Sequence, residues 1–388
     1  MIERELTARA LEMADTFPVV SITGPRQSGK STLVKAAFPN YRYVNLEDKD
    51  MRAFANDDPR SFLQAYPAGS IIDEAQRAPD LFSYLQGTVD RADEPGQYIL
   101  SGSQNFLLLE SISQSLAGRV AILNLLPLSY RELAEAKLLP ETLNNWMYTG
   151  GYPRIYAQGI NPTDFYPSYI QTYLERDVRK ELGVQKIAEF ERFLALCAIR
   201  TGNMLNKEDL ARDCGVTVKT VENWLSVLEA SFIALRLQPY YRNFGKRLVK
   251  APKLYLCDTG LACNLLDMEH ADELAIDPMR GALFETAVVS EIQKTALSQG
   301  KKPKLYYWRD VNKQEADLII EKGARPWCVI EVKSSATYHS KFFTTISGLG
   351  DLLGVPTQRR YVVYAGDRSF QTTRGNVVAM GDITSILQ

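Results

Sequence analysis

A glycine-rich stretch between a strand-like and a helix-like segment constrains this chain of 388 residues more than any other feature. Residues 24–31 read GPRQSGKS and fit the pattern GxxxxGK[ST] at every fixed position. Residues 19–23 are apolar and β-branched, as buried strands are, and residues 32–37 favour a helix. Glycines let the backbone N–H groups converge on phosphate oxygens, and the helix adds its positive N-terminal end. The stretch therefore predicts a phosphate-binding loop in a parallel α/β sheet.

The side chains of this loop have expected roles. Lys30 supplies a mobile positive charge for the β- and γ-phosphates of a nucleotide, and Ser31 offers a hydroxyl to Mg²⁺. We therefore expect ATP and Mg²⁺ as cofactors. The residues expected to bind them are consecutive: Gly24, Pro25, Arg26, Gln27, Ser28, Gly29, Lys30, Ser31 and Thr32.

A second apolar segment ends in acids. Residues 70–74 read SIIDE, and Asp73 lies 43 positions after Lys30. Asp73 is predicted to hold the magnesium ion with Ser31, directly or through water, and Glu74 to polarise the attacking water as a general base. The alternative, an ordinary surface turn, leaves the pairing with the loop at Lys30 unexplained.

A third strand-like run, residues 97–104, ends in small polar residues. The carboxyl ends of parallel strands meet at one edge of a sheet, so Ser103 or Gln104 is expected beside the γ-phosphate or the water. Arg119 precedes a further apolar run at 120–126. We expect it near the rim of a nucleotide site, where it could reach the γ-phosphate of a neighbouring subunit. A strand-ending turn and a surface arginine are the respective alternatives.

These segments resemble the AAA+ ATPases, in particular the bacterial and archaeal group that joins an AAA module to a C-terminal domain with a nuclease-like fold. The resemblance implies hydrolysis in a homo-oligomeric ring, with Ser103 or Gln104 at the sensor-1 position and Arg119 as an arginine finger acting on the adjacent subunit. It also implies a sensor-2 arginine, for which Arg154 and Arg176 are both candidates. The motifs that carry it are GPRQSGKST (24–32), SIIDEAQ (70–76), ILSGSQ (99–104), SLAGRV (115–120), LPLSYREL (126–133), GGYPR (150–154) and YLERDVR (173–179).

Changes of pattern along the chain, together with this resemblance, predict five segments in an α/β protein. They are a P-loop AAA+ ATPase core at 1–130, a helical lid at 131–187, a winged helix-turn-helix at 188–250, a connecting segment at 251–280 and a restriction-endonuclease-like α/β domain at 281–388.

The winged-helix segment is predicted from two helical patterns on either side of a turn at Cys214-Gly215. The second helix offers Lys219 and Asn223 but also Glu222, so we expect contacts to DNA phosphates rather than base reading. Residues 240–247, YYRNFGKR, would form a basic, aromatic wing. The alternative is a winged helix that packs only against protein.

Acidic residues near the C-terminus form a second candidate site. Glu331 and Lys333 lie two residues apart in a strand-like run and therefore share a face. Asp317 and Glu331 are candidates to chelate Mg²⁺, Lys333 to position a water for attack on a phosphodiester, and Glu285 to add a carboxylate. The set resembles the PD-(D/E)xK nuclease core, in which an acidic helix residue, an acidic strand end and an E-x-K strand meet. The resemblance leaves both cleavage and binding without cleavage open.

The charge balance narrows the choice of partner. The chain has a formal net charge of −1, but residues 176–260 hold 15 basic against 10 acidic residues, and residues 281–388 hold 14 against 10. A polyanion such as DNA would bind there, although such an excess is also common on solvated surfaces. The five cysteines show no CxxC spacing, and no apolar run approaches the roughly 18 residues of a membrane span, so we expect a cytoplasmic protein without a membrane partner.

Two functions fit these observations. The first is a Mg²⁺-dependent ATPase whose conformational cycle acts on DNA held by residues 188–260 and 281–388. The second is a nucleotide-dependent signalling switch or scaffold that acts on protein partners and has a catalytically inactive nuclease-like domain. A steep loss of DNA affinity with rising salt is expected for the first function only.

Overall fold

The computed structural model describes residues 2–92, 94–103, 115–174, 187–240 and 251–388. The chain divides into two compact units. Among the described residues, no helix is both long and apolar enough to cross a membrane. The first unit comprises Met1–Leu128, Ala230–Phe232 and Leu297–Lys301, and the second comprises Ser129–Glu229, Ile233–Ala296 and Lys302–Gln388.

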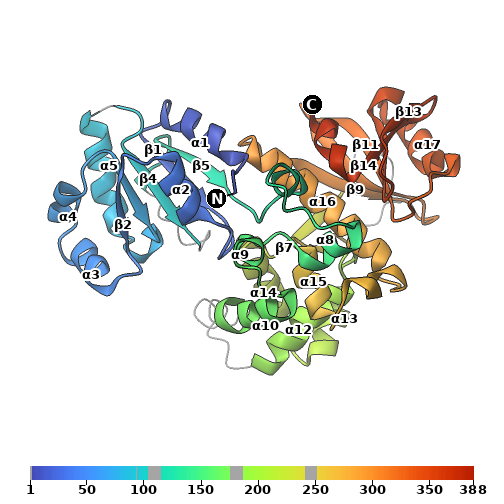
Figure 1. Ribbon diagram of the computed structural model, residues 1–388, viewed down its shortest axis with the longest axis horizontal. Coiled ribbons are helices and arrows are strands. Elements are labelled where there is room, and N and C mark those ends of the chain that lie inside the picture. Colours follow the sequence, from blue (N-terminus) through green and yellow to red (C-terminus); the bar gives the residue numbers. More distant parts are fainter. Residues whose placement is uncertain (1, 93, 104–114, 175–186, 241–250) are drawn as a thin grey trace. The chain divides into compact units, whose positions relative to one another are not determined.

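The first unit, drawn in blue and cyan in Figure 1, is built on a parallel sheet. The strand order of this sheet is β2-β3-β4-β1-β5. The sequence predicts strands at 19–23, 70–74, 97–104 and 120–126, and the structure has one in each. It also has β2, which the sequence pattern misses because the segment RYVN is partly exposed and lacks an apolar run. The strands are β1 (Val19–Thr23), β2 (Arg42–Asn45), β3 (Ser70–Asp73), β4 (Tyr98–Gly102) and β5 (Val120–Asn124).

Alternate residues of these strands fill two cores, one on each face of the sheet. Val19 and Leu100 share a cluster with Phe82, and Val20 shares the other with Leu33. Because both faces are covered, β1 is buried along its whole length. The helices of this unit are α1 (Leu6–Ala14), α2 (Lys30–Ala37), α3 (Lys49–Asp57), α4 (Pro59–Ala65), η1 (Ala75–Arg77) and α5 (Leu81–Ala92).

The second unit begins with short helices, as expected of the segment 131–187. Ser129 and Glu132 form a capping box at the first helix, and prolines occupy the first turns of α9 and α10. Gly150 lies in a break between helices, where a Cβ would come within 2.2 Å of the Tyr166 hydroxyl. These elements are α7 (Tyr130–Glu135), α8 (Leu143–Thr149), α9 (Pro153–Gln158), α10 (Pro162–Tyr169) and η2 (Ile170–Leu174).

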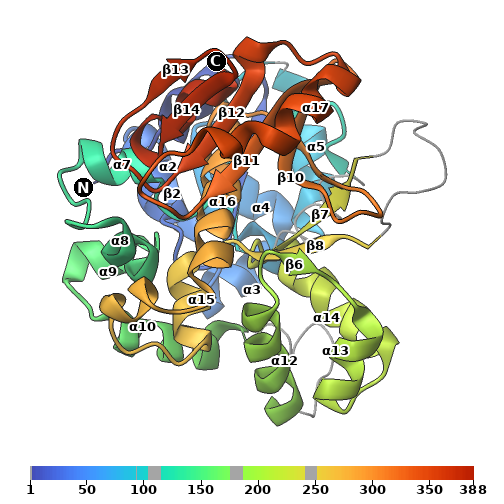
Figure 2. The same cartoon turned by 90° about the vertical axis from the view of Figure 1, so that its right-hand side faces the viewer.

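The next segment has the helix–turn–helix order that the sequence predicts. Asn206 caps the first helix of the pair, and Gly215 ends it in the left-handed conformation. Trp224 of the second helix packs on Phe190 and Phe193. The elements are α12 (Ile187–Ile199), β6 (Asn203–Met204), α13 (Lys207–Cys214), α14 (Val218–Ala230) and β7 (Ala234–Pro239), seen together in Figure 2.

The strands of the second unit form one sheet in the order β13-β14-β12-β11-β10-β9-β7-β8-β6. The parallel pairing of β7 with β9 joins strands from the segments at 188–250 and 281–388 into that sheet. The C-terminal elements are α16 (Arg280–Ser298), β9 (Lys304–Arg309), β10 (Glu315–Lys322), β11 (Arg325–Lys333), η4 (Ser340–Phe343), α17 (Thr344–Leu353), η5 (Thr357–Arg359), β12 (Arg360–Tyr364), β13 (Phe370–Thr372), β14 (Gly375–Ala379) and η6 (Met380–Leu387).

Residues 251–280 are more than the connection that the sequence analysis expects. They form β8 (Lys253–Leu256), α15 (Thr259–Leu265) and η3 (Ala271–Ala275), and β8 lies between β7 and β6 in the sheet. Asp258 caps α15 and also accepts hydrogen bonds from Gly151 N–H (2.8 Å) and the Tyr166 hydroxyl (2.7 Å). The segment is therefore part of the core of the second unit.

Candidate functional site

The glycine-rich loop has a backbone that its glycines make possible. Gly24 and Gly29 have φ values of +154° and +94°, and Gln27 between them also has a positive φ of +60°. A Cβ on Gly24 would lie 2.1 Å from the carbonyl oxygen of Leu125. A side chain at this position would therefore collide with the backbone that follows β5.

Lys30 is buried over the loop that precedes it. Its Nζ donates to the carbonyl oxygens of Gly24 (3.0 Å) and Pro25 (2.8 Å). Arg4, which the sequence analysis missed, donates from Nη1 to the Ser28 carbonyl (2.7 Å) and bonds the chain after β5 through Nη2. Ser28 Oγ is buried and has no hydrogen-bond partner among the described residues. Two basic side chains thus bond the carbonyl groups of the loop, which also contains a buried hydroxyl with no partner among the described residues.

Asp73 lies at the centre of a cluster of hydroxyl groups at the carboxyl edge of the sheet. Its Oδ2 accepts from Ser31 Oγ (2.6 Å) and from the Tyr43 hydroxyl (2.7 Å), and its Oδ1 accepts from Ser101 Oγ. Burial and the Asp73 carboxylate raise the pKa of Tyr43. The structure therefore brings Ser31 and Asp73 together as predicted. It adds Tyr43 and Ser101, which come from the neighbouring strands β2 and β4.

Glu74 follows Asp73 in a left-handed backbone conformation, with a φ of +55°. Its Oε2 accepts hydrogen bonds from Gln76 Nε2 (2.7 Å) and Ser103 Oγ (3.3 Å). The two residues predicted to handle the attacking water, Glu74 and Ser103, are therefore in contact. Gln104, the alternative to Ser103, lies outside the described residues.

A hollow of about 310 Å³ lies beside the loop and is lined by Ser31, Thr32, Lys35 and Ala36. The ammonium of Lys35 lies 3.6 Å from the ring centre of Tyr43. The volume falls at the lower end of the range of roughly 300–1,000 Å³ typical of small-molecule pockets. All four lining residues belong to α2.

Arg119 does not lie at the nucleotide site of its own chain. Its carbonyl accepts from Val19 N–H (3.2 Å) at the amino ends of β5 and β1, whereas the loop follows the carboxyl end of β1. Its side chain binds Asp90 on α5 with both Nε and Nη2, the latter at 2.9 Å. This ion pair lowers the pKa of Asp90. The expectation of a position at the rim is therefore wrong within one chain, because the strands are parallel and the two residues mark opposite edges of the sheet.

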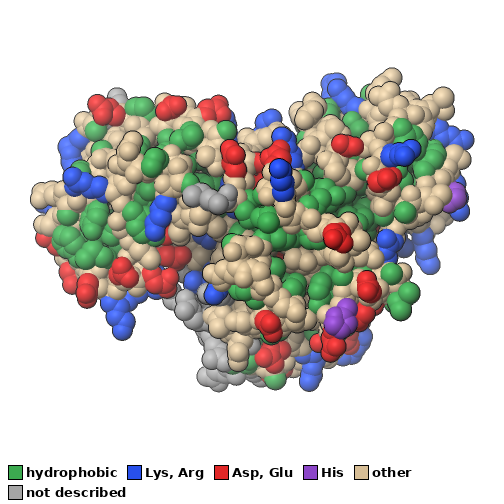
Figure 3. Space-filling model, in the orientation of Figure 1, with side chains coloured by type: hydrophobic (Ala, Val, Ile, Leu, Met, Phe, Trp, Pro, Cys, Tyr) green, Lys and Arg blue, Asp and Glu red, His purple; other side chains and the backbone are tan. Residues whose placement is uncertain are grey.

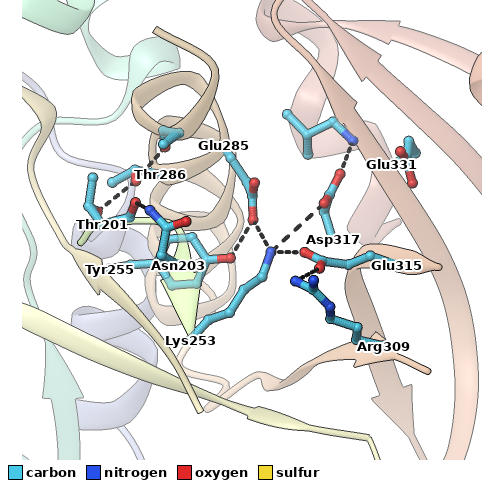
Figure 4. A network of polar contacts seen from close by, with 12 residues as sticks. Thr201, Asn203, Lys253, Tyr255, Glu285, Thr286, Arg309, Glu315, Asp317 and Glu331 are labelled. Atoms are coloured by element: carbon cyan, nitrogen blue, oxygen red, sulfur yellow. Dashed lines mark hydrogen bonds and ion pairs between the residues drawn. The ribbon is translucent and has the colours of Figure 1, made fainter. Parts of the chain in front are cut away.

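The predicted C-terminal acids gather on neighbouring elements of the second unit (Figure 4). Glu285 comes from α16, Asp317 from β10, and Glu331 and Lys333 from β11. Lys333 Nζ binds Glu331 Oε1 at 2.5 Å, and Val332 N–H donates to Asp317 Oδ2 at 2.7 Å. Burial, and then Asp317, raise the pKa of Glu285 to about 7 and that of Glu331 to about 8.

Two further residues, Glu315 and Lys253, complete this cluster. Oxygens of Glu285, Glu315 and Asp317 all lie within 4.8 Å of one another. Lys253 Nζ reaches all three: it lies 2.8 Å from Glu285 and 3.9 Å from Asp317 and pairs closely with Glu315. Burial alone would lower the pKa of Lys253, but these carboxylates outweigh it and the pKa is raised. Glu315 was predictable, since it shares a strand face with Asp317.

The position between Glu285 and Glu315 does not fit a Mg²⁺ ion. Such an ion would bond carboxylate oxygens at about 2.0–2.1 Å. Between Glu285 and Glu315 that position coincides with the Lys253 ammonium, which bonds to both (Figure 4). The two cations therefore exclude each other.

The remaining candidates lie in the second unit. Lys219 and Asn223 are exposed on α14, while Glu222 pairs with Arg236 (2.5 Å) and Lys207 (3.1 Å). Arg154 binds Gln158 on its own helix at 2.9 Å. Arg176 and residues 241–247 of the predicted wing lie outside the described residues.

Three family models match the chain: an AAA domain at residues 16–134 and two domains of unknown function, DUF8612 at 140–272 and DUF4143 at 280–383. The Walker-type ATPase of Pyrococcus abyssi is a similar solved structure, with a TM-score of 0.46 and 15% identity over 68% of this chain and 96% of that chain.

Relatives match the chain over most of its length. The uncharacterized proteins Rv2008c of Mycobacterium tuberculosis and Mb2031c of Mycobacterium bovis are each 33% identical over 373 residues, which is 95% of this chain and 81% of theirs. An uncharacterized protein of Haemophilus influenzae is 22% identical over 304 residues, 70% of this chain and 75% of its own. The chain therefore belongs to the family of these mycobacterial proteins and carries an AAA-type P-loop ATPase domain in its first unit.

Proposed function

We propose that the first unit hydrolyses ATP with the help of Mg²⁺. The observation that carries this proposal is the 2.6 Å contact between Ser31 Oγ and Asp73 Oδ2, which joins the phosphate loop to the acidic end of β3. A hydroxyl and a carboxylate in contact are oxygen ligands of the kind that Mg²⁺ accepts, so these residues fit the ion. When bound there, the ion would neutralise charge on the β- and γ-phosphates.

In this proposal, the backbone amides of residues 24–32 bind the phosphates. Lys30 exchanges its bonds to the carbonyls of Gly24 and Pro25 for bonds to phosphate oxygens, a short movement for a side chain already curled over the loop. Ser28 Oγ gains the partner that it lacks among the described residues. The hollow lined by Thr32 and Lys35 receives the rest of the nucleotide.

Glu74 and Ser103 act on the attacking water. Glu74 Oε2 accepts the proton of the water as the water attacks the γ-phosphate. The hydroxyl of Ser103, 3.3 Å from this oxygen, orients the carboxylate and the water. The left-handed backbone of Glu74 supports this role, because strained backbone of this kind clusters at functional sites.

Arg119 serves a neighbouring chain in this proposal. Its position at the amino edge of the sheet keeps it from the loop of its own chain. A homo-oligomeric ring would bring the Arg119 edge of one subunit to the loop edge of the next. Arg119 would then exchange Asp90 for the γ-phosphate of its neighbour.

An ATPase assay on the full chain tests the proposal. Lys30→Ala removes the charge that binds the phosphates, so we expect turnover to fall by at least about 100-fold. Lys49→Ala, at an exposed position of the same unit, is the matched control and should leave turnover unchanged. Normal turnover by Lys30→Ala would contradict the assignment of residues 24–32 as the phosphate-binding loop.

For the second unit we propose a winged helix followed by a restriction-endonuclease-like fold that binds DNA. The order α12-β6-α13-α14-β7-β8, with β6, β8 and β7 antiparallel, supports the winged helix. The order α16-β9-β10-β11-α17-β12, with β9 to β11 antiparallel and β12 parallel to β11, supports the nuclease-like fold. The domain limits at 130, 187, 250 and 280 stay predictions. Cleavage is not part of the proposal.

The alternative is a nucleotide-dependent switch or scaffold that acts on protein. The engagement of Glu222 with Arg236 and Lys207 favours it, because two of the nearby basic groups are already paired. On the face drawn in Figure 3, basic side chains are scattered among acidic and hydrophobic ones.

A salt titration of DNA binding separates the two functions. Contacts to several phosphates require a steep fall of affinity with salt, with a slope of about −0.9 for each neutralised phosphate. If the second unit binds DNA, Lys219→Ala should make the fall of DNA affinity with salt less steep. Lys49→Ala should leave this salt dependence unchanged. A DNA affinity that does not change with salt concentration would favour the switch or scaffold that acts on protein.

A further inference from the structure

We propose that Lys253 is a built-in cation that takes the place of a divalent metal ion in the carboxylate cluster of Glu285, Glu315 and Asp317. The inference rests on the nuclease-like fold proposed above, in which a metal ion would be expected among these acids. It deepens that proposal by naming the group that stands in the metal position and keeps the metal out.

The contacts of Lys253 are those of a central cation. The side chain leaves the start of β8, and its ammonium contacts Glu285 of α16 and both acids of β10 (Figure 4). The residue is 2% exposed, so water reaches the ammonium poorly. Oxygens of Glu285 and Glu315 lie at bonding distance from this ammonium, and Asp317 lies 3.9 Å away.

Each of these three carboxylates also has a donor other than Lys253. Glu285 Oε1 accepts from the Tyr255 hydroxyl at 2.5 Å, and Glu315 Oε2 accepts from Arg309 Nη1 at 2.9 Å. Asp317 Oδ2 accepts from the backbone N–H that follows Glu331, at 2.7 Å. Buried charges persist where partners offset their loss of hydration, and each of these three acids has such a partner.

The cation comes from a part of the sheet outside the nuclease-like core. β8 pairs with β7 and β6, and residues 253 and 285 are 32 positions apart. The occupancy of the cluster is therefore linked to the position of β8. A displacement that withdraws Lys253 would expose three acids to a divalent ion, and the return of β8 would expel it.

Mn²⁺ binding to the nucleotide-free full chain tests this inference. Binding is measured in a titration by the loss of the electron paramagnetic resonance signal of free Mn²⁺. Lys253→Met removes the charge and keeps the length of the side chain. We expect the variant to bind Mn²⁺ at least about 100-fold more tightly than the parent, because an unpaired buried acid cluster then needs a new cation. Adding Asp317→Asn to the variant should abolish that gain.

A control separates this effect from a general loss of packing. Lys294→Met removes another buried lysine, paired at 2.8 Å with Glu291 on the same helix as Glu285. It should lower the melting temperature without creating a Mn²⁺ site. If Lys253→Met is unfolded alone, millimolar Mn²⁺ should restore its melting transition, and a chain that stays unfolded with Mn²⁺ contradicts the inference.

The outcomes distinguish the inference from the function on which it rests. Tight Mn²⁺ binding by the parent chain that Asp317→Asn removes would overturn the role of Lys253 and leave the nuclease-like fold standing. The same follows from Mg²⁺-dependent nicking of DNA by the parent that Asp317→Asn removes. Mn²⁺ binding by Lys253→Met without any DNA binding would support the role of Lys253 and count against the DNA function.

Discussion

The two acidic sites of this protein stabilise their buried carboxylates in different ways. In the first unit, the Asp73 carboxylate is surrounded by neutral hydroxyl groups from Ser31, Tyr43 and Ser101. In the second unit, Glu285 and its neighbouring acids surround the ammonium of Lys253.

This difference decides what each site can accept. Hydroxyl groups exchange a hydrogen bond for a metal bond at little electrostatic cost, so the first site is open to a cation and an anion from outside. An ammonium among carboxylates must leave before another cation enters, and its departure uncovers several buried charges. In the function proposed above, the first site also needs Arg119 from a neighbouring chain, since this residue lies at the far edge of its own sheet, whereas the second site receives Lys253 from its own chain.

The largest expected effect tests whether the first site is completed by a neighbour. Arg119→Ala should lower ATP turnover by about 1,000-fold or more, because an arginine finger stabilises charge that develops on the γ-phosphate. Mixing Arg119→Ala subunits with Glu74→Gln subunits should restore part of the turnover. Arg91→Ala, on the helix that carries Asp90, is the control and should have no such effect. Turnover that mixing leaves unchanged would argue against action across an interface.

The next effect tests the water-activating pair. Glu74→Gln should slow ATP hydrolysis by about 100- to 1,000-fold, since a positioned general base is lost while the contacts to the phosphates remain. ATP binding, measured with a fluorescent analogue, should be preserved. Glu47→Gln is a matched control, because Glu47 binds Arg77, the arginine that also approaches Glu74. Equal hydrolysis by the parent and Glu74→Gln would mean that another residue orients the water.

The sequence was most informative where function follows from a short local pattern. The loop at 24–32 follows β1 and the acids at 73 and 74 end β3, on either side of β4. Parallel strands end at the same edge of a sheet, so the contact of Ser31 with Asp73 was predictable. Tyr43 was not, because β2 is short and half exposed and shows no strand pattern. Arg4 was missed for a similar reason, since nothing in its neighbourhood indicates that it bonds the loop.

The second unit was less predictable because its site depends on long-range packing. Glu331, Lys333 and Asp317 were recognised as candidate site residues because each lies in a strand-like run. Glu315 lies on the same strand face as Asp317. Lys253 belongs to a segment that the pattern suggested was only a connection. Its role depends on the pairing of β7 with β9, which places strands of two predicted domains in one sheet.

A change of pH should affect the second site through the raised pKa values of Glu285 and Glu331, about 7 and about 8. An unfolded glutamate titrates near pH 4.3, so between about pH 4.3 and 8 the folded chain binds more protons than the unfolded chain. The free energy of unfolding should therefore fall as pH rises through this window and then level off.

Urea denaturation at several pH values checks this dependence. Glu331→Gln has no titrating group at position 331, so the free energy of unfolding of this variant should fall less steeply with pH than that of the parent. Glu321→Gln, on the neighbouring strand β10, is the control and should keep the slope of the parent. A slope that is the same in all three proteins would show that the acids of the cluster stay ionised throughout.

The smallest effect sharpens the picture of the first site, where hydroxyl groups prepare a carboxylate for a metal. Tyr43→Phe removes one of the two donors to Asp73 Oδ2 and leaves the ring under Lys35 in place. We expect the Mg²⁺ concentration for half-maximal ATP turnover to rise about tenfold, because groups that orient a metal ligand contribute to metal affinity. Turnover at saturating Mg²⁺ should change little. Tyr41→Phe, which loses only a bond to the Gly96 carbonyl, should leave the Mg²⁺ requirement unchanged. If both variants require the same Mg²⁺ concentration as the parent, Tyr43 contributes only to the fold. Its hydroxyl group then does not prepare Asp73 for a metal ion.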